Sequence, residues 1–426
     1  MASTKPKSSL ERQLSQALST RHQNSLLRQL STSPPDSTDF SSNDFLSLAT
    51  SPVLRAAYLS ELQSHYATFP LGSGGSRLLD GNSRYADDLE SSISTFHGAE
   101  AGLLFNSGFD ANAGVFATVP QRGDVIVHDE LIHASVHDGM RLSRAARRVG
   151  FRHNDVGDLR RVLEDEVNSD EGVKSGERNV FIAVESVYSM DGDLAPLREI
   201  VELKEEVLPH GNGHVIIDEA HGTGVLGPLG RGLVCDLGLE GRVFARLHTF
   251  GKSLACSGAI VLCSPVVRSY LINYARPLIY TTFMPFPSLA MIKASYSLLR
   301  NGYADELSTH LRSLVSHFHA LLMASIARQS RDNLLLHVTA ACPRSPIFAL
   351  ETNDCRSLAK YCQDGGFVVR AVVPPTVPTR RVRVCLHAGN TFEEINGLVR
   401  RIDEWLATRL KPQVHESADA EIKARL

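Results

Sequence analysis

Four residues whose side chains can take part in catalysis lie in the middle part of the chain: Ser189, Asp218, His221 and Lys252. A lysine can form a Schiff base with pyridoxal phosphate, and a buried carboxylate can keep the pyridine nitrogen of that cofactor protonated. The protonated ring is an electron sink that stabilises a carbanion at the α-carbon of an amino-acid substrate. Each residue alone has an ordinary explanation, as a turn residue, a helix cap, a core histidine or a solvated charge. The prediction of a pyridoxal phosphate site therefore depends on their joint occurrence.

A phosphate site is predicted at Ser107-Gly108-Phe109, where a helix is expected to begin directly after the apolar run Leu103–Phe105. Free backbone N–H groups at the start of a helix bind anions, and nearby hydroxyl groups add further donors. Thr249, three residues before Lys252, is expected to supply one such hydroxyl.

The segment Phe250–Ser253 also resembles the end of the nucleotide-binding loop G-x-x-x-x-G-K-[ST]. The first glycine of that motif would fall at position 246, which is Arg246, so the nucleotide loop is rejected. The glycine-rich run Gly72–Ser76 lacks the G-x-G-x-x-G spacing and has no predicted strand before it. A structural turn and a functional loop both remain open for this run.

The elements that must position these residues are short apolar strands separated by helical segments. Continuous apolar runs of this kind indicate a mostly parallel sheet that is covered on both faces, hence an α/β fold. Asp218, His221, Ser189 and Ser107 all follow the carboxyl ends of predicted strands, the edge at which open α/β sheets bind ligands. The predicted strands are Leu103–Phe105, Val125–Val127, Val180–Val184, Val215–Ile217 and Ala259–Leu262.

Four parts of the chain are predicted. Residues 1–52 form an N-terminal helix and arm, 53–298 a large cofactor-binding domain, 299–412 a smaller C-terminal α/β domain, and 413–426 a polar tail. The smaller domain is expected to hold strands at Ile347–Leu350, Phe367–Val373 and Val382–Leu386 and a last helix at Glu393–Leu410. The stretch Leu10–Leu30, rich in arginine and serine, is open to two interpretations, a mitochondrial presequence or a helix on the protein body.

The composition excludes several classes of protein. Lys and Arg number 44 against 47 Asp and Glu, a formal net charge of −3, so the basic footprint of a nucleic-acid-binding protein is missing. No apolar run reaches the roughly 20 residues of a membrane span. The seven cysteines contain no C-x-x-C pair, as is typical of reduced cysteines. Neither nucleic acid nor membrane is expected as a partner.

The motifs resemble those of the α-oxoamine synthase family of fold-type I pyridoxal phosphate enzymes, over about residues 15–405. Among its members, Gly72–Arg77 and Pro374–Pro378 favour those of biotin biosynthesis. The resemblance implies a large, mostly parallel-sheet domain with a smaller C-terminal α/β domain. The matching segments are Phe40–Leu46, Gly72–Arg77, Leu103–Phe109, His133–Ser135, His153–Asp155, Tyr188–Asp193, Asp218–Gly224, Thr249–Lys252, Tyr280–Thr282 and Pro374–Pro378.

The resemblance implies pyridoxal 5'-phosphate as the cofactor and Lys252, His133 and Asp218 as catalytic residues. Lys252 would bond the cofactor and then remove the α-proton of the amino acid. His133 would stack on the cofactor ring, and Asp218 would pair with the ring nitrogen. The remaining expected cofactor contacts are His221 and Ser189 on the phenolic-oxygen side, and Ser107, Gly108, Phe109 and Thr249 at the phosphate, joined by Thr282 from a second subunit.

The implied reaction joins L-alanine to pimeloyl-CoA with loss of CO2 and CoA. Arg383 would clamp the amino-acid carboxylate, while Arg28 and Thr376 would contact the acyl substrate. No metal is expected. The chain departs from the family in three places: a shorter linker between Leu30 and Phe40, which affects the position of Arg28; two missing residues after Pro378, which make Arg381 a rival of Arg383; and an unusual segment at Cys385–Asn390.

Two further functions remain open, a related synthase with another acyl chain or glycine, and a catalytically silent partner subunit. A homodimer with shared active sites is expected, with the apolar run Ile279–Pro287 at the interface, where Phe283, Met284 and Phe286 would otherwise be exposed. The last three residues, Ala424-Arg425-Leu426, fit the small-basic-leucine pattern read by the peroxisomal import receptor. Peroxisomal delivery is therefore expected, with cytosol or mitochondrion as alternatives.

Overall fold

The computed structural model describes residues 8–30, 32–65, 67–329 and 335–410. The chain divides into two compact units, Met1–Ser37 and Thr38–Leu426. The predicted polar tail and its final tripeptide lie outside the described residues. Within the described ranges, no helix combines the length and apolar character that crossing a membrane would require.

The first unit contains helix α1 (Ser9–Gln23), which is shorter than the predicted stretch Leu10–Leu30. A capping box starts the helix: the Ser8 N–H donates to the Glu11 carboxylate at 2.6 Å, and the Glu11 N–H donates to Ser8 Oγ at 3.2 Å. Leu10, Leu14 and Leu18 recur every four residues and are exposed. The helix therefore presents an apolar stripe on one face.

The second unit is built around a seven-stranded sheet of order β2-β8-β7-β6-β5-β3-β4. Strand β8 is antiparallel to both neighbours, and the remaining neighbouring pairs are parallel. The mostly parallel sheet is thus confirmed. Its strands are β2 (Ala101–Phe105), β3 (Val125–Asp129), β4 (Arg147–Phe151), β5 (Val180–Glu185), β6 (Gly213–Asp218), β7 (Ala245–Thr249) and β8 (Ala259–Cys263).

Strands β4 and β7 were not predicted, because each interrupts its apolar pattern with charged or polar residues. In β7 these residues are buried and paired: Arg246 donates to the His97 carbonyl at 3.1 Å, and His248 Nδ1 lies 2.9 Å from the Thr223 hydroxyl. A buried polar side chain that finds its partner in another element leaves no signal in the local sequence.

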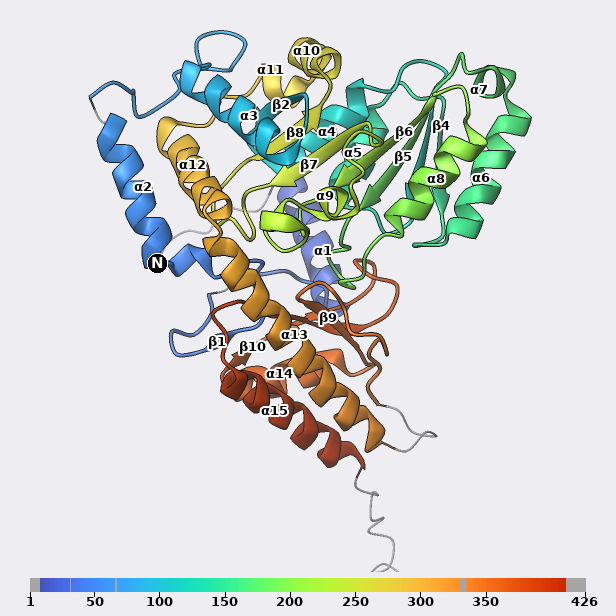
Figure 1. Ribbon diagram of the computed structural model, residues 1–426. Helices are drawn as coiled ribbons and strands as arrows, with labels where there is room; N and C mark the ends of the chain where they lie inside the picture. The colour runs from blue at the N-terminus through green and yellow to red at the C-terminus, as the bar shows by residue number, and fades with distance from the viewer. Residues whose placement is uncertain (1–7, 31, 66, 330–334, 411–426) are drawn as a thin grey trace, which may run out of the picture. The chain divides into compact units, whose positions relative to one another are not determined.

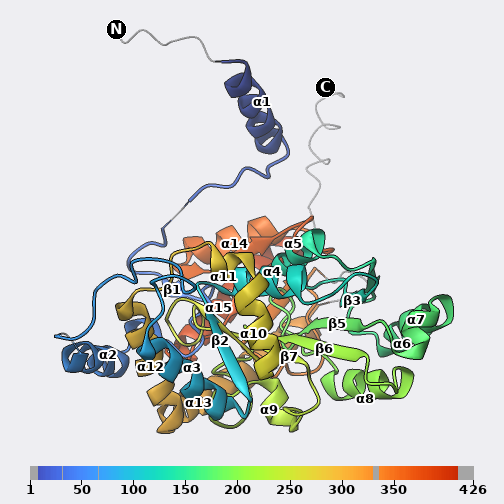
Figure 2. The same cartoon turned by 90° about the horizontal axis from the view of Figure 1, so that it is seen from above.

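The side chains of each central strand alternate between two helical layers. In β5, Val180, Ile182 and Val184 face a core with helices α6 (Val156–Ser169) and α8 (Leu197–Val207), whereas Phe181 and Ala183 face α4 (Gly108–Thr118) and α5 (Ala134–Leu142). The sheet is therefore buried on both faces. Figure 2 shows its strands edge-on between α4 and α5 on one side and α8 and α9 (Leu233–Leu237) on the other.

Helices α3 (Arg84–His97) and α12 (Phe286–Arg300) cover the sheet near its β2 edge, whereas α7 (Glu171–Ser175) lies beside α6 at the other end (Figure 1). Leu104, Ile260 and Leu262 of the sheet form a third core cluster with α3 and α12. Also present are α2 (Pro52–His65), α10 (Pro265–Tyr274) and α11 (Arg276–Ile279), with short 3-10 helices at Leu48–Thr50 and Pro228–Gly230.

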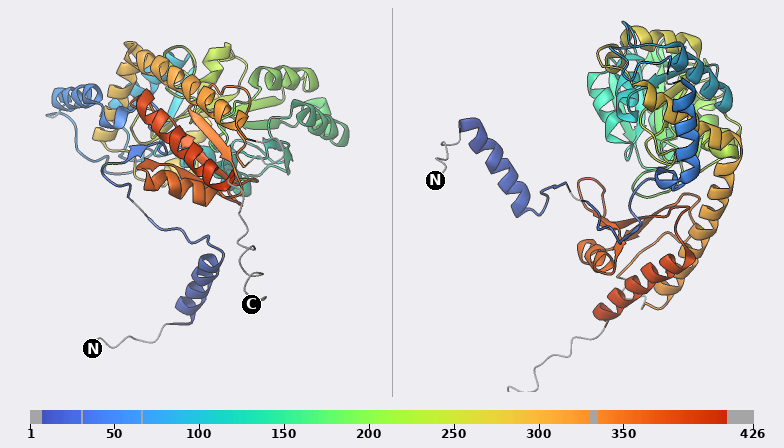
Figure 3. Two further views of the ribbon diagram at one scale, coloured as in Figure 1. Left: turned by 90° about the horizontal axis from the view of Figure 1, so that it is seen from below. Right: turned by 90° about the vertical axis from the view of Figure 1, so that its left-hand side faces the viewer.

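The C-terminal part is a three-stranded antiparallel sheet, β11-β12-β9, flanked by helices. Helices α13 and α15 pack side by side (Figure 3). The predicted strand at Phe367–Val373 proves to be two short strands. The elements are α13 (Tyr303–Ala327), β9 (Ile347–Glu351), α14 (Cys355–Asp364), β10 (Phe367–Val368), β11 (Arg370–Val372), β12 (Arg381–Cys385) and α15 (Phe392–Leu410).

The segment after Ser37 is hydrogen-bonded to strands of the C-terminal part, where β1 (Thr38–Asp39) and β10 form a two-stranded sheet of their own. Strand β1 pairs in parallel with β10, the Cys385 N–H donates to the Phe40 carbonyl at 2.8 Å, and the Ala388 N–H donates to the Phe45 carbonyl at 2.8 Å. This pairing brings the Phe40–Leu46 motif against β12. The boundary expected at residue 298 falls in the last turn of α12, and the division into a large and a small domain stays a prediction.

Candidate functional site

Eight of the predicted site residues line one cavity of about 300 Å³ at the carboxyl edge of the large sheet. They come from the ends of β6 and β7 and from the starts of α4 and α5, which follow β2 and β3. Residues distant in sequence thus converge where parallel strands end, as an open α/β sheet requires. The eight are Ser107, Gly108, Phe109, His133, Asp218, His221, Thr249 and Lys252.

One end of the cavity has the shape of an anion cradle. Ser107 is the N-cap of α4: its Oγ accepts from the Asp110 N–H at 3.0 Å. A Cβ added to Gly108 would lie 2.4 Å from Thr249 Cγ2, so only glycine lets the helix start pack this closely on β7. The free N–H groups of the first turn and the Thr249 side chain therefore lie together, as a phosphate group requires.

Asp218 ends β6 with its carboxylate held by two donors. Oδ1 accepts from the Ala220 N–H at 2.9 Å, and Oδ2 accepts from Asn112 Nδ2 at 2.7 Å. No helix begins at this position, so Asp218 is not a helix cap. The side chain is 8 % exposed and borders the cavity. A fixed, nearly buried carboxylate is suited to pair with a protonated nitrogen of a ligand.

Lys252 lies in a tight turn after β7, in which the Ala255 N–H donates to the Lys252 carbonyl at 2.9 Å. Burial lowers the pKa of its amine to about 8, although the nearby Asp218 and Glu185 carboxyls oppose that shift. A lysine amine with a pKa in this range is partly neutral near physiological pH. It can therefore act as a nucleophile or a base.

The two cavity histidines are both shifted toward the neutral form. Burial lowers the pKa of His221 well below its ordinary value, and the positive charges of Lys252 and Arg383 add to that effect. Among the described residues, its buried Nδ1 has no hydrogen-bond partner. Buried polar atoms are almost always paired, so this nitrogen fits a polar atom of a bound group. His133 is exposed at the cavity, and desolvation also lowers its pKa.

Arg383 and Arg381 lie on the same face of β12 but have different hydrogen-bond partners. Arg383 donates to the Ser189 carbonyl at 2.7 Å and to Asn43 Oδ1, a cavity-lining residue, at 2.9 Å. Arg381 is 1 % exposed and is bonded to Asp191 and to the Thr379 hydroxyl. Arg383 thus contacts the cavity wall through Asn43, whereas Arg381 is bonded to Asp191, and which of the two binds a substrate carboxylate stays a prediction.

Besides Arg383, four predicted residues do not line this cavity. Ser189 contacts Arg383 through its carbonyl. Thr282 is exposed, and its carbonyl accepts from Asn106 Nδ2 at 2.7 Å. Thr376 lies exposed in the turn after Val373. Arg28 belongs to the N-terminal unit and is exposed. Their expected contacts with cofactor or substrate stay predictions.

Sequence reasoning missed four polar residues of the cavity wall: Asn43, Asn112, Ser135 and Glu185. Glu185 ends β5 directly opposite Asp218, so the strand-end criterion could have found it. Asn112 follows Gly108 by one helical turn and therefore shares its face of α4. Burial raises the pKa of Glu185 well above its ordinary value, and the Asp218 charge adds to the rise.

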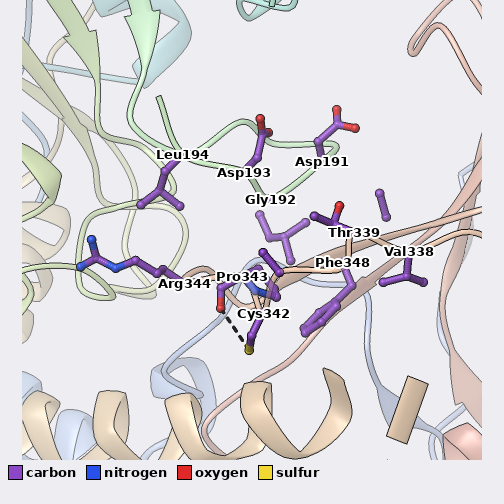
Figure 4. A pocket seen from close by; sticks show the side chains of 13 residues that line it. Asp191, Gly192, Asp193, Leu194, Val338, Thr339, Cys342, Pro343, Arg344 and Phe348 are labelled. Atoms are coloured by element: carbon purple, nitrogen blue, oxygen red, sulfur yellow. Dashed lines mark hydrogen bonds between the residues drawn. The ribbon is translucent and has the colours of Figure 1, made fainter. Parts of the chain in front are cut away.

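A second cavity of about 230 Å³ lies on another side of the loop that follows β5 and shares no lining residue with the first. Figure 4 shows the loop at Asp191, Gly192 and Asp193 across the cavity from Pro343 and Phe348, with both carboxylates pointing away from these two residues. The Ser345 hydroxyl donates to the Gly192 carbonyl at 2.5 Å. This contact fastens the loop to the C-terminal sheet and supports the placement of Ser189 beside Arg383.

Comparisons with known proteins agree with this geometry. The sequence pattern of the family Aminotransferase class I and II matches residues 35–402. The chain is 55 % identical to the 8-amino-7-oxononanoate synthase of Emericella nidulans over 395 residues, covering 92 % of this chain and 95 % of the relative. It is 42 % identical to the aminoacyl transferase sphA of Aspergillus fumigatus over 375 residues, 85 % of this chain and 80 % of the relative.

A solved structure, a variant serine palmitoyltransferase from S. paucimobilis with a bound PLP–myriocin aldimine, superposes with a TM-score of 0.79. It is 26 % identical in sequence, and the match covers 94 % of this chain and 99 % of that one. This match confirms the predicted fold class. The chain belongs to the class I and II aminotransferase family and, within it, to the α-oxoamine synthases that its motifs indicated.

Proposed function

We propose that the chain is a pyridoxal-phosphate-dependent acyltransferase that condenses L-alanine with pimeloyl-CoA to 8-amino-7-oxononanoate, releasing CoA and CO2. The observation that carries this proposal is the meeting of Lys252, Asp218 and the anion cradle of α4 in one cavity. The relative that is 55 % identical over nearly its whole length bears the name of this activity.

The residues present fit the cofactor. The start of α4 and Thr249 would hold the phosphate, and Asp218 would pair with the ring nitrogen. The unpartnered Nδ1 of His221 would meet the phenolic-oxygen side. When bound, pyridoxal phosphate supplies an electron sink for negative charge at the substrate α-carbon.

The protein's own groups then perform three tasks. Lys252 Nζ takes the α-proton of the amino acid, which its pKa of about 8 permits near neutral pH. Arg383, braced by Asn43 and the Ser189 carbonyl, binds the substrate carboxylate. Asp218 keeps the ring nitrogen protonated. A bond forms between the alanine α-carbon and the thioester carbonyl carbon, the CoA thiolate leaves, and the alanine carboxyl group departs as CO2, after which a proton takes its place on the α-carbon.

A related synthase activity is the second candidate. The aminoacyl transferase relative shows that chains of this family at 42 % identity carry another name. The third possibility, a silent partner subunit, is disfavoured because Lys252 and Asp218 are both present and both line the cavity.

The first prediction tests the substrate pair. Purified enzyme given L-alanine or glycine with acyl-CoAs of several lengths should convert the alanine and pimeloyl-CoA pair fastest, as measured by mass spectrometry of the products. Lys252→Ala should abolish this turnover, because it removes the base and the cofactor attachment. Lys293→Ala is the matched control, since that lysine pairs with Glu61 at 2.8 Å outside the cavity. A clear preference for glycine or for long acyl chains would favour the related synthase.

The second prediction concerns pH. The Lys252 amine must be neutral to bond the cofactor, and it becomes neutral above its pKa of about 8. The rate at which apo-protein gains the absorbance of bound cofactor should therefore rise with pH, with a midpoint near 8. The Asp218 charge favours the ammonium form, so Asp218→Asn should shift the midpoint to lower pH. Asp236→Asn, at a carboxylate bound to Arg344, should leave it unchanged. An unshifted Asp218→Asn midpoint contradicts the coupling.

We also propose a homodimer in which Thr282 reaches the partner's phosphate site. Thr282 and Tyr280 are exposed, and the Phe283 N–H bonds the Gly75 carbonyl at 2.9 Å, which places the exposed Leu71 and Leu79 in a loop joined to this segment. The expectation that Phe283, Met284 and Phe286 lie at the interface is wrong: all three are buried in the core of their own subunit. The interface would instead use the exposed residues around them.

The third prediction tests the shared site by mixing two inactive variants. Lys252→Ala and a bulky substitution such as Thr282→Trp should each be inactive alone. A mixed dimer would hold one site with both lesions and one with neither, so co-refolding should restore up to about half of the activity per mixed dimer. The dimers are verified by two affinity tags of different kinds. Tagged mixed dimers without any activity would rule out the shared site.

We further propose delivery to peroxisomes through Ala424-Arg425-Leu426. Support comes from the tripeptide pattern alone. The fourth prediction is that a fluorescent protein followed by residues 411–426 concentrates in peroxisomes, and that deletion of the last three residues returns it to the cytosol. Colocalisation microscopy measures both. An even distribution of the intact fusion would exclude this signal.

A further inference from the structure

A chain of hydrogen bonds links the Asp218 carboxylate to the cavity histidine. Asn112 Nδ2 lies 2.7 Å from Asp218 Oδ2 and 3.0 Å from Ser135 Oγ. Ser135 Oγ lies 2.7 Å from His133 Nδ1. Asn112 and Ser135 are 3 % and 0 % exposed, so water does not compete for the bonds that Asn112 makes. The chain connects β6, α4 and the start of α5.

The donors and acceptors available on these groups allow the series of hydrogen bonds to run in only one direction. A carboxylate only accepts, so the Asn112 amide must turn its NH2 group toward Asp218. The second hydrogen of that group goes to Ser135 Oγ, which leaves the serine hydroxyl to donate to His133 Nδ1. The backbone N–H of Ser135, a donor only, also points at His133 Nδ1 at 3.2 Å. Two donors thus meet at one ring nitrogen, which must be unprotonated.

We propose that Asn112 and Ser135 are positioning residues that keep His133 as a neutral ring with its proton on Nε2. Nδ1 is occupied as an acceptor, so the one proton of the neutral ring must reside on the other nitrogen. His133 is also the N-cap of α5, and the positive end of a helix disfavours a positive charge on its cap. The importance of this state for turnover rests on the proposed function, whereas the protonation state itself does not.

Some groups around His133 favour its protonated ring, and others favour its neutral ring. The negative charge of Asp218 favours the imidazolium, and Lys252 opposes it, with desolvation the largest cause of the lowered pKa. Glu185 accepts a hydrogen bond from the His133 backbone N–H and is itself shifted toward the neutral form. Two neighbouring histidines, His221 and His137, are likewise shifted toward the neutral form by desolvation, which lowers the pKa of each.

The consequence is a defined set of charges and donors at the cofactor ring. A neutral His133 adds no cation beside Lys252, so the lysine amine is not pushed further from the ammonium form. Its Nε2–H remains a hydrogen-bond donor on the ring edge opposite Ser135. If the imidazole were free to rotate or to change tautomer, this donor would be lost in part of the molecules. The Asn112–Ser135 hydrogen bonds therefore couple the order of His133, which would stack on the cofactor ring, to Asp218, which would pair with the ring nitrogen.

The fifth prediction tests the protonation state on the native protein. Nitrogen-15 NMR of histidine-labelled protein, with and without pyridoxal phosphate, distinguishes protonated from unprotonated ring nitrogens, and a His133→Gln spectrum assigns the signals. From about pH 6 to 8, the interval in which free histidine titrates, His133 should show an unprotonated Nδ1 and a protonated Nε2. A protonated Nδ1 at neutral pH would overturn the proposal, whatever the enzyme's substrate.

Variants separate positioning from a merely structural role. Ser135→Ala removes one donor to His133 Nδ1. The pH at which His133 becomes charged should therefore rise by roughly 0.5 to 1 unit. The low-pH limb of the kcat/KM profile should move to higher pH with it. Ser135→Thr keeps the hydroxyl and should keep the native titration. Ser94→Ala is the matched control, because that buried serine bonds only its own helix, at the Glu90 carbonyl. If Ser135→Ala lowers the melting temperature but leaves the His133 titration unchanged, the role is structural and the proposal is wrong.

Discussion

The burial of the Lys252 amine beside two carboxyl groups is the constraint on which the rest of the site depends. Burial disfavours an ammonium ion and lowers the pKa of this one to about 8, although Asp218 and Glu185 both oppose the shift. The same burial raises the pKa of Glu185 well above its ordinary value, with the Asp218 charge adding to the rise. The Asp218 carboxylate accepts hydrogen bonds from the Ala220 N–H and the Asn112 amide. The other polar groups of the cavity surround this balance of charge between the Lys252 amine and the two carboxyl groups.

The large sheet makes that balance possible because it places the ends of its strands at one edge. Asp218 and Glu185 are direct neighbours in the β5–β6 pairing, and Thr249 at the end of β7 touches the space that Gly108 leaves open. Rigid strands and helix starts hold such groups more accurately than loops do. The C-terminal sheet adds Arg383 through β12, and the segment after Ser37 adds Asn43. The site is therefore assembled from both ends of the second unit.

The sequence alone predicted the chemistry and most of the scaffold. The apolar runs of β2, β3, β5, β6 and β8 could be recognised because strands buried on both faces leave a continuous local signal. Lys252, Asp218, His221 and the Ser107–Phe109 cradle could be chosen because their residue types and their places after strands are local properties, whereas His133 was chosen through the family resemblance. Strands β4 and β7 escaped, since their buried polar residues are explained only by partners elsewhere in the fold.

Only the tertiary structure determined the contacts between residues far apart in the chain. The Asn112–Asp218 bond joins positions 106 residues apart, and the bond between Arg381 and Asp191 joins positions 190 residues apart. The burial of Phe283 within its own subunit likewise depends on packing against distant helices. Sequence patterns report which chemistry a residue can do and which local element it prefers. Hydrogen-bond direction, pKa and burial are set by neighbours that folding supplies, and so these were determined by the structure.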